Sequence, residues 1–227
     1  MRVVLNCDID NSIVDLIKST ILDLEKDLHT KLFQGGVIIF KGNCEYSGMT
    51  TRTNKHNYDF SEWDVKPVLM LDINAFNEFS MYSLAFKHSK SFEEKLVKTI
   101  CHEAIHSIII KKFKYNFRDI DVEPNEPKDN TKIEYKRRYE LQLGEKNGSV
   151  QKGSEEFMTY INNWFVDNYI RNDKNNEWAF NNISQYSVEG GVDEFLAECY
   201  LARRTYIPRL TQDIEDKLDE VINYCCA

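Results

Sequence analysis

The chain has 227 residues, of which 42% are hydrophobic and 12% aromatic, and its formal net charge is −8. This length suits a single domain over residues 1–227, and the negative charge argues against nucleic acid as a partner. No apolar run is long enough to span a membrane, and Asp8 interrupts the N-terminus before a signal-peptide core can form. We therefore expect a cytoplasmic protein, as encoded, with no membrane partner.

The first part of the chain predicts a small sheet with helices packed on it. Short apolar runs near residues 2–9, 37–41 and 67–73 predict strands. Residues 11–29 form an amphipathic helical pattern between the first two runs. Residues 43–57 are polar and loop-like, with room for one short strand.

A long apolar helix is predicted over residues 91–117. It opens with the pattern S-F-E-E, a capping box that satisfies free backbone groups at a helix start. Its apolar stripe is wide, which is typical of a buried helix. The polar residues on this helix, His102, Glu103 and His106, then need partners, because an unpaired buried polar group costs several kcal/mol.

The spacing of these three residues predicts a metal site. His102 and His106 are four residues apart, so they share one helix face and can bind one Zn²⁺ ion. Glu103 lies beside them and can act as a general base on water at that ion. The pattern H-E-x-x-H is typical of zinc peptidases. A pair of hydrogen-bonded core histidines is the alternative.

The sequence predicts a mostly helical second part of the chain. Residues 115–153 carry two prolines and many charges, and weak alternation over 132–143 fits either a hairpin flap or an exposed linker. An aromatic stripe predicts a helix over 155–169, most simply as core packing. A further helix is expected over 192–204 and a weaker one over 211–224.

A catalytic zinc ion needs a third protein ligand, and a later carboxylate is the natural candidate. Glu194 and Glu198 are four residues apart on one predicted helix. One of them can bind the metal while the other accepts a hydrogen bond from a ligand imidazole. Glu156, about 50 residues after His106, is the alternative ligand. Tyr186, in a predicted loop, can swing towards the metal and stabilise an oxyanion.

Two short motifs carry a family resemblance. The pattern Tyr186-Ser187 followed by Glu194-Phe195-Leu196-Ala197-Glu198 resembles the gluzincin-type catalytic domain of anthrax lethal factor. It is also similar to the Pro-Pro endopeptidases of clostridia and to zincin-like domains of phage and mobile elements. The resemblance implies that His102, His106 and Glu194 bind zinc and that Glu103 is the base. It further implies that Glu198 supports a ligand imidazole and that Tyr186 is the oxyanion donor.

The chain departs from that family in two places. The gap between His106 and Glu194 is long, which implies an insertion over about residues 115–175. Ile105 stands where the family usually has glycine. We therefore expect an N-terminal α/β part (residues 1–114), the insertion, and a C-terminal helical part (about 176–227) that carries the third ligand.

These observations predict an α+β, zincin-like fold and a zinc-dependent endopeptidase acting on a peptide or protein substrate. In zincins an edge strand pairs with extended substrate, and the strand expected to do so has the residues Leu69, Met70, Leu71, Asp72 and Ile73. The rival interpretation is a zincin-like structural or interaction module, for example a virion component with an assembly partner. Export by a non-classical route would change only the location.

Overall fold

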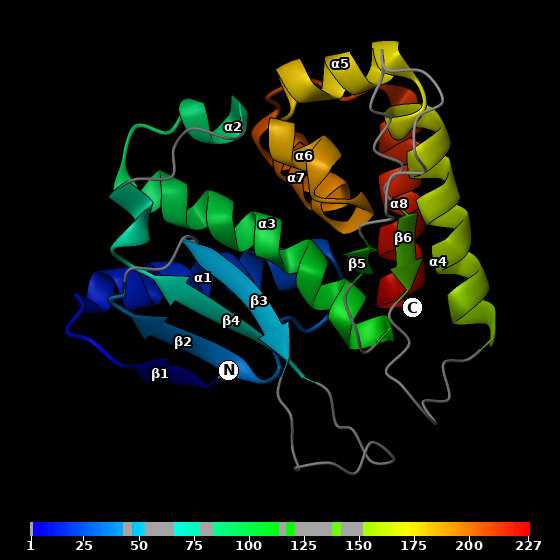
Figure 1. Cartoon of the computed structure of the whole chain (residues 1–227). Coiled ribbons are helices and arrows are strands. Elements are labelled where there is room, and N and C mark those ends of the chain that lie inside the picture. Colours follow the sequence, from blue (N-terminus) through cyan, green and yellow to red (C-terminus); the bar gives the residue numbers. More distant parts are fainter. Residues whose placement is uncertain are drawn as a thin grey trace.

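The computed structural model describes residues 2–42, 47–52, 66–77, 84–113, 117–120, 138–141 and 152–227. Within these ranges the chain has a mixed α+β architecture, with one small sheet and a larger helical part (Figure 1). The N-terminal half contributes the sheet and its packing helices. The C-terminal part is helical, apart from a two-stranded ladder that precedes it.

The sheet has four strands in the order β1-β2-β4-β3. The parallel strands are β1 (Val3–Leu5), β2 (Gly36–Phe40) and β4 (Pro67–Asp72), and β3 (Gly48–Arg52) runs antiparallel to β4. The three strands expected from apolar runs are thus present. The fourth falls in the polar stretch that left room for one.

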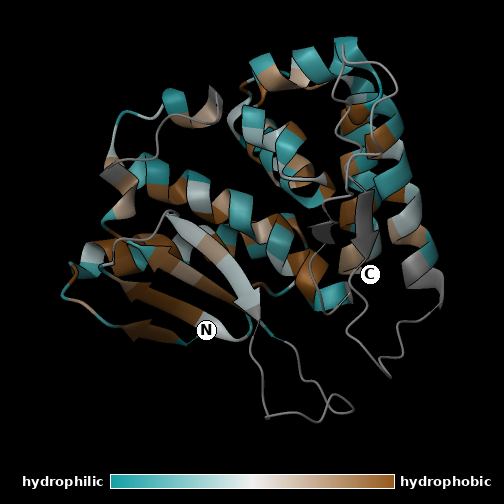
Figure 2. Ribbon diagram, in the orientation of Figure 1, coloured by the Kyte–Doolittle hydropathy of each residue, from teal (hydrophilic) through white to brown (hydrophobic). Residues whose placement is uncertain are grey.

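The prediction that Leu69–Ile73 forms the free edge is wrong. Within β4, Leu69, Met70 and Leu71 pair with β2 on one side and with β3 on the other, and Asp72 pairs with Phe40 of β2. Ile73 follows the end of the strand. The physical reason lies in composition: β4 is buried along most of its length, which suits an interior strand, whereas the polar β3 tolerates an exposed edge. Figure 2 shows β4 as hydrophobic and β3 as nearly neutral.

Two helices pack on the sheet. α1 (Asn11–Asp27) begins at Asp10, whose side chain accepts a hydrogen bond from the backbone N–H of Ser12. α3 (Phe92–Phe113) packs against α1 and against β3 and β4. These helices share one core with the alternate strand residues on one face of the sheet: Val37, Ile39, Leu69 and Leu71.

α3 is shorter than predicted at its C-terminal end. It ends at Phe113, and strand β5 (Phe117–Ile120) follows, paired antiparallel with β6 (Arg138–Leu141). β6 falls within the predicted 132–143 alternation, but its partner strand β5 lies outside that range. The rest of the 132–143 pattern lies outside the described residues.

Six helical segments make up the C-terminal part. They are α4 (Lys152–Phe165), a π-helical turn (Val166–Ile170), α5 (Asp173–Asn182), α6 (Gln185–Glu189), α7 (Val192–Thr205) and α8 (Gln212–Cys226). The boundary expected at residue 175 therefore falls inside α5. Two short turns of helix, Ala75–Asn77 and α2 (Leu84–Lys87), precede α3.

α7 is the central helix of this part and is buried along most of its length. It packs against α3 (Figure 1). Arg204 near its end pairs with Asp23 of α1 at 2.6 Å, and the Tyr200 hydroxyl donates to Asp27 at 2.7 Å. These contacts fix α7 relative to α1. None of the helices in the described ranges is both long and apolar enough to cross a membrane.

Candidate metal centre

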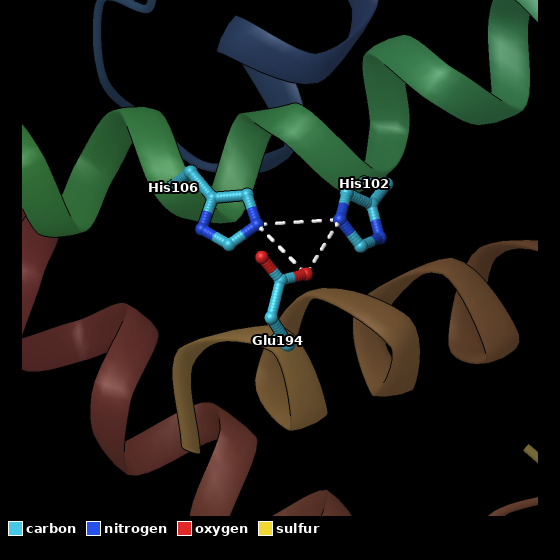
Figure 3. A group of neighbouring side chains, drawn as sticks. All are labelled: His102, His106 and Glu194. Carbon is cyan, nitrogen blue, oxygen red and sulfur yellow. Dashed lines mark hydrogen bonds and ion pairs between the residues drawn. The ribbon is translucent and has the colours of Figure 1, made fainter. Parts of the chain in front are cut away.

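The two histidines of α3 face one carboxylate of α7. The Nε2 atoms of His102 and His106 lie 3.2 Å apart. Glu194 Oε2 lies 3.1 Å from the first and 3.4 Å from the second (Figure 3). Within the described part of the chain, these residues form the one group of potential metal ligands whose atoms all lie within 4.8 Å of one another. Helical spacing explains the pair of histidines, and the packing of α7 on α3 supplies the glutamate.

The size of this triangle fits a zinc ion. Tetrahedral zinc has nitrogen and oxygen ligands at about 2.0–2.1 Å, which places any two ligands about 3.3–3.4 Å apart. The three observed separations are close to that value. Two imidazoles and one carboxylate are also donors that zinc accepts readily. The residues therefore fit the metal that the sequence predicted.

Glu194 Oε2 is buried, and the two imidazole nitrogens that face it approach without hydrogen-bond geometry. A buried carboxylate oxygen held in this way can take an ion. Glycines leave room for this side chain, since a Cβ on Gly190 would lie 2.8 Å from Glu194 Cγ. Gly191 begins α7 with a φ of 101°, a conformation that favours glycine.

Each imidazole turns its other nitrogen towards a second carboxylate of α7. His102 Nδ1 lies 3.4 Å from Glu198 Oε1, where the sequence expected support for a ligand imidazole. His106 Nδ1 lies 3.9 Å from Asp193 Oδ2. Sequence reasoning missed Asp193, although its place beside Glu194 in the first turn of the helix was a usable signal.

The two imidazoles and the carboxylates of the site shift one another's pKa values. Burial lowers the pKa of His102 and of His106, but Glu194 and its neighbouring carboxylates outweigh it, so that both pKa values rise, that of His106 to about 9. Burial raises the pKa of Glu194, yet the two imidazoles bring it well below its usual range. Burial and the charge of Glu194 raise the pKa of Asp193 to about 7. Without a metal, protons on the imidazoles thus balance the carboxylates.

Glu103 lies where α3 meets the edge strand. Its side chain is buried, and the Thr50 hydroxyl of β3 donates to its backbone carbonyl at 3.1 Å. Gly48 allows the close approach, because a Cβ there would lie 2.3 Å from Thr99 Cγ2 and 3.5 Å from Glu103 Cγ. The terminal strand of the sheet, as far as the described residues show it, therefore runs past the general-base candidate. The sequence did not indicate this role for β3.

Tyr186 reaches the centre from α6. Its hydroxyl donates to Glu194 Oε1 at 3.3 Å, while 42% of the residue remains exposed. The expected loop is a short helix instead, begun by Ser184, whose side chain accepts from the Ser187 N–H at 2.9 Å. The phenol of Tyr186 thus lies between the carboxylate of Glu194 and solvent.

No protein-family model, no curated protein and no solved structure matches this chain significantly.

The alternative ligand Glu156 is not part of the cluster. It is exposed on α4, whereas the group with ligand atoms in mutual reach contains Glu194. Three potential ligand atoms can together hold a metal ion, the carboxylate of Glu103 can move a proton, and the phenol of Tyr186 can donate a hydrogen bond to an anion. That combination is suited to hydrolysis.

Proposed function

We propose that this chain is a zinc-dependent endopeptidase with a zincin-like fold. The observation that carries the proposal is the group of three potential ligands, His102, His106 and Glu194, with Glu103 next to the first of them in sequence. Structural zinc sites are usually closed by four protein ligands, whereas catalytic sites use three and leave one position open. The described residues supply three. When bound, zinc would lower the pKa of water towards about 7 and polarise the carbonyl to be cleaved.

Glu103 is assigned the proton transfer. As general base it takes a proton from the attacking water, and it then gives that proton to the leaving amine. Glu103 is only 6% exposed, which supports this role. A carboxylate that is shielded from bulk water exchanges its proton with the attacking water and the leaving amine and not with solvent. A purely structural site has no use for such a group.

Tyr186 is assigned to the oxyanion. Its hydroxyl lies 3.3 Å from Oε1 of Glu194, and it would donate instead to the carbonyl oxygen of a bound substrate. The hydrogen bond strengthens as negative charge develops on that oxygen.

Strand β3 replaces β4 as the strand that would hold the substrate. Among the strands that the structure describes, β3 has β4 as its one neighbour, and its other side would offer backbone groups to an extended peptide. The contacts of Gly48 and Thr50 with α3 place that edge beside Glu103. A protein or peptide is therefore the proposed substrate class.

The decisive experiment compares wild type with Glu103→Gln. We expect one zinc per chain in both proteins by elemental analysis, and cleavage of a peptide library at neutral pH by wild type alone. Glu93→Gln, an exposed change at the start of the same helix, is the matched control and should cleave normally. Equal cleavage by the Glu103→Gln protein would refute the proposed role. Bound zinc without cleavage of any library member would favour the rival, a structural or virion-assembly module.

A further inference from the structure

We propose that Asp193 is a positioning residue of the metal centre, which holds the imidazole of His106 so that its Nε2 atom faces the ion. This inference rests on the proposed zinc site and deepens it. Glu198 would do the same for His102. The two ligand imidazoles would then have one supporting carboxylate each, both supplied by α7.

The orientation of the rings is the first observation. A neutral imidazole that binds a metal through Nε2 carries its proton on Nδ1, and that proton needs an acceptor. His106 turns Nε2 towards Glu194 at 3.4 Å and Nδ1 towards Asp193 at 3.9 Å. Figure 3 shows this second nitrogen on the side of the ring away from His102. The arrangement repeats that of His102, with Nε2 on Glu194 and Nδ1 on Glu198.

The burial of Asp193 is the second observation. The residue is 7% exposed, and its carboxylate meets the backbone N–H groups of Asp193 and Glu194 and the imidazole of His106. The separation of 3.9 Å exceeds a hydrogen bond by about 0.7–1.2 Å. When a metal ion binds Nε2 of His106, the one N–H proton left on the ring is at Nδ1. The distance from Nδ1 to Asp193 Oδ2 should therefore shorten to that of a hydrogen bond.

A carboxylate in the first turn of a helix also stabilises the helix start, and this general role must be separated from the specific one. The chain offers a matched control. Asp193 is the second residue of α7, and Asp213 is the second residue of α8. Asp213 is exposed, and its charge acts on Tyr169. Both residues can stabilise a helix start, whereas Asp193 alone of the two pairs with a ligand imidazole.

The test measures zinc affinity by competition with a chromophoric chelator. We expect Asp193→Ala to weaken zinc binding by about 10–100-fold, the usual effect of removing the partner of a ligand histidine. Asp213→Ala should leave the affinity unchanged. Asp193→Asn keeps an acceptor without the charge, so its affinity should lie between wild type and Asp193→Ala. In NMR spectra of the zinc-loaded proteins, the Nδ1 proton of His106 should exchange faster in both Asp193 variants, while that of His102 keeps its wild-type rate.

Three results would overturn the inference. Wild-type affinity and exchange in Asp193→Ala would do so, and if that variant does not fold, the same result in Asp193→Asn decides. Equal losses of affinity in Asp193→Ala and Asp213→Ala would show an effect of the helix start. A wild-type chain that binds no zinc would refute the metal centre itself, a result that differs from the other two because it is seen before any variant is made.

Discussion

Replacing Gly48 by alanine tests how closely β3 lies against α3. The added Cβ would lie 2.3 Å from Thr99 Cγ2 but 3.4 Å from Leu71 Cδ2 and 3.5 Å from Glu103 Cγ. Carbon atoms are in optimal contact at about 3.5–4.0 Å, so Thr99 is the main obstacle and must move by about 1.2 Å. We expect the variant to lose about 1–3 kcal/mol of unfolding free energy, the usual cost of overpacking.

Thr99→Ser gives the matched control, because it removes the obstructing methyl and keeps the hydroxyl that lies 3.4 Å from Ser47 Oγ. By itself it should cost about 0.8 kcal/mol for the lost methyl contact. In the double variant with Gly48→Ala the clash disappears, so the total loss should be smaller than the sum of the two single losses by about 1 kcal/mol or more. Urea denaturation of the metal-free proteins in chelator measures all four free energies.

Additive losses in this cycle would refute the reasoning, since they would show that β3 does not approach α3 at Thr99. The cycle also bears on function. A strand pushed away from α3 presents its free edge further from Glu103, so Gly48→Ala should reduce peptide cleavage more than zinc content.

The remaining predictions concern the metal centre. Glu194→Ala should weaken zinc binding strongly, while Glu156→Ala should leave it near wild type. If only Glu156→Ala weakens binding, the third ligand is Glu156 and not Glu194. Tyr186→Phe should lower kcat by about 10–10³-fold with little change in KM, the range for one oxyanion donor, and an unchanged kcat would remove the tyrosine from the mechanism. In the metal-free protein the pKa values of His102 and His106 are raised above the ordinary 6.5, that of His106 to about 9. Both imidazoles therefore stabilise the fold below pH 6.5, and the contribution of His106 is lost as the pH rises through about 9. The thermal midpoint in chelator should fall over that window, and a flat midpoint would show that the imidazoles are not paired as described.

The parts of the site that lie on single helices could be predicted from the sequence. His102 and His106, like Glu194 and Glu198, are related by the fixed spacing of a helix, so one face of each helix follows from local geometry. The packing of α7 on α3 depends on tertiary structure, which local spacing does not determine. It was expected only through the family resemblance and the need for a third ligand.

The edge of the sheet could not be predicted in the same way. Strand order depends on which strands pair, and the apolar run of β4 suits an interior strand without identifying its neighbours. The edge strand β3 is short and polar, so its pattern also fits a loop with room for a strand. Asp193 was missed for a related reason, because an acid at a helix start has an ordinary local explanation.

The separation of α3 and α7 along the chain has a consequence for biosynthesis. Glu194 is made 88 residues after His106, which takes roughly 4–18 s at common rates of translation. On the proposed zinc site, a growing chain displays the histidine pair without Glu194 during that interval, and two imidazoles alone would hold zinc weakly. Tight binding of the ion would therefore wait until α7 has emerged and docked, and its free energy would then join the middle and last thirds of the polypeptide late in folding.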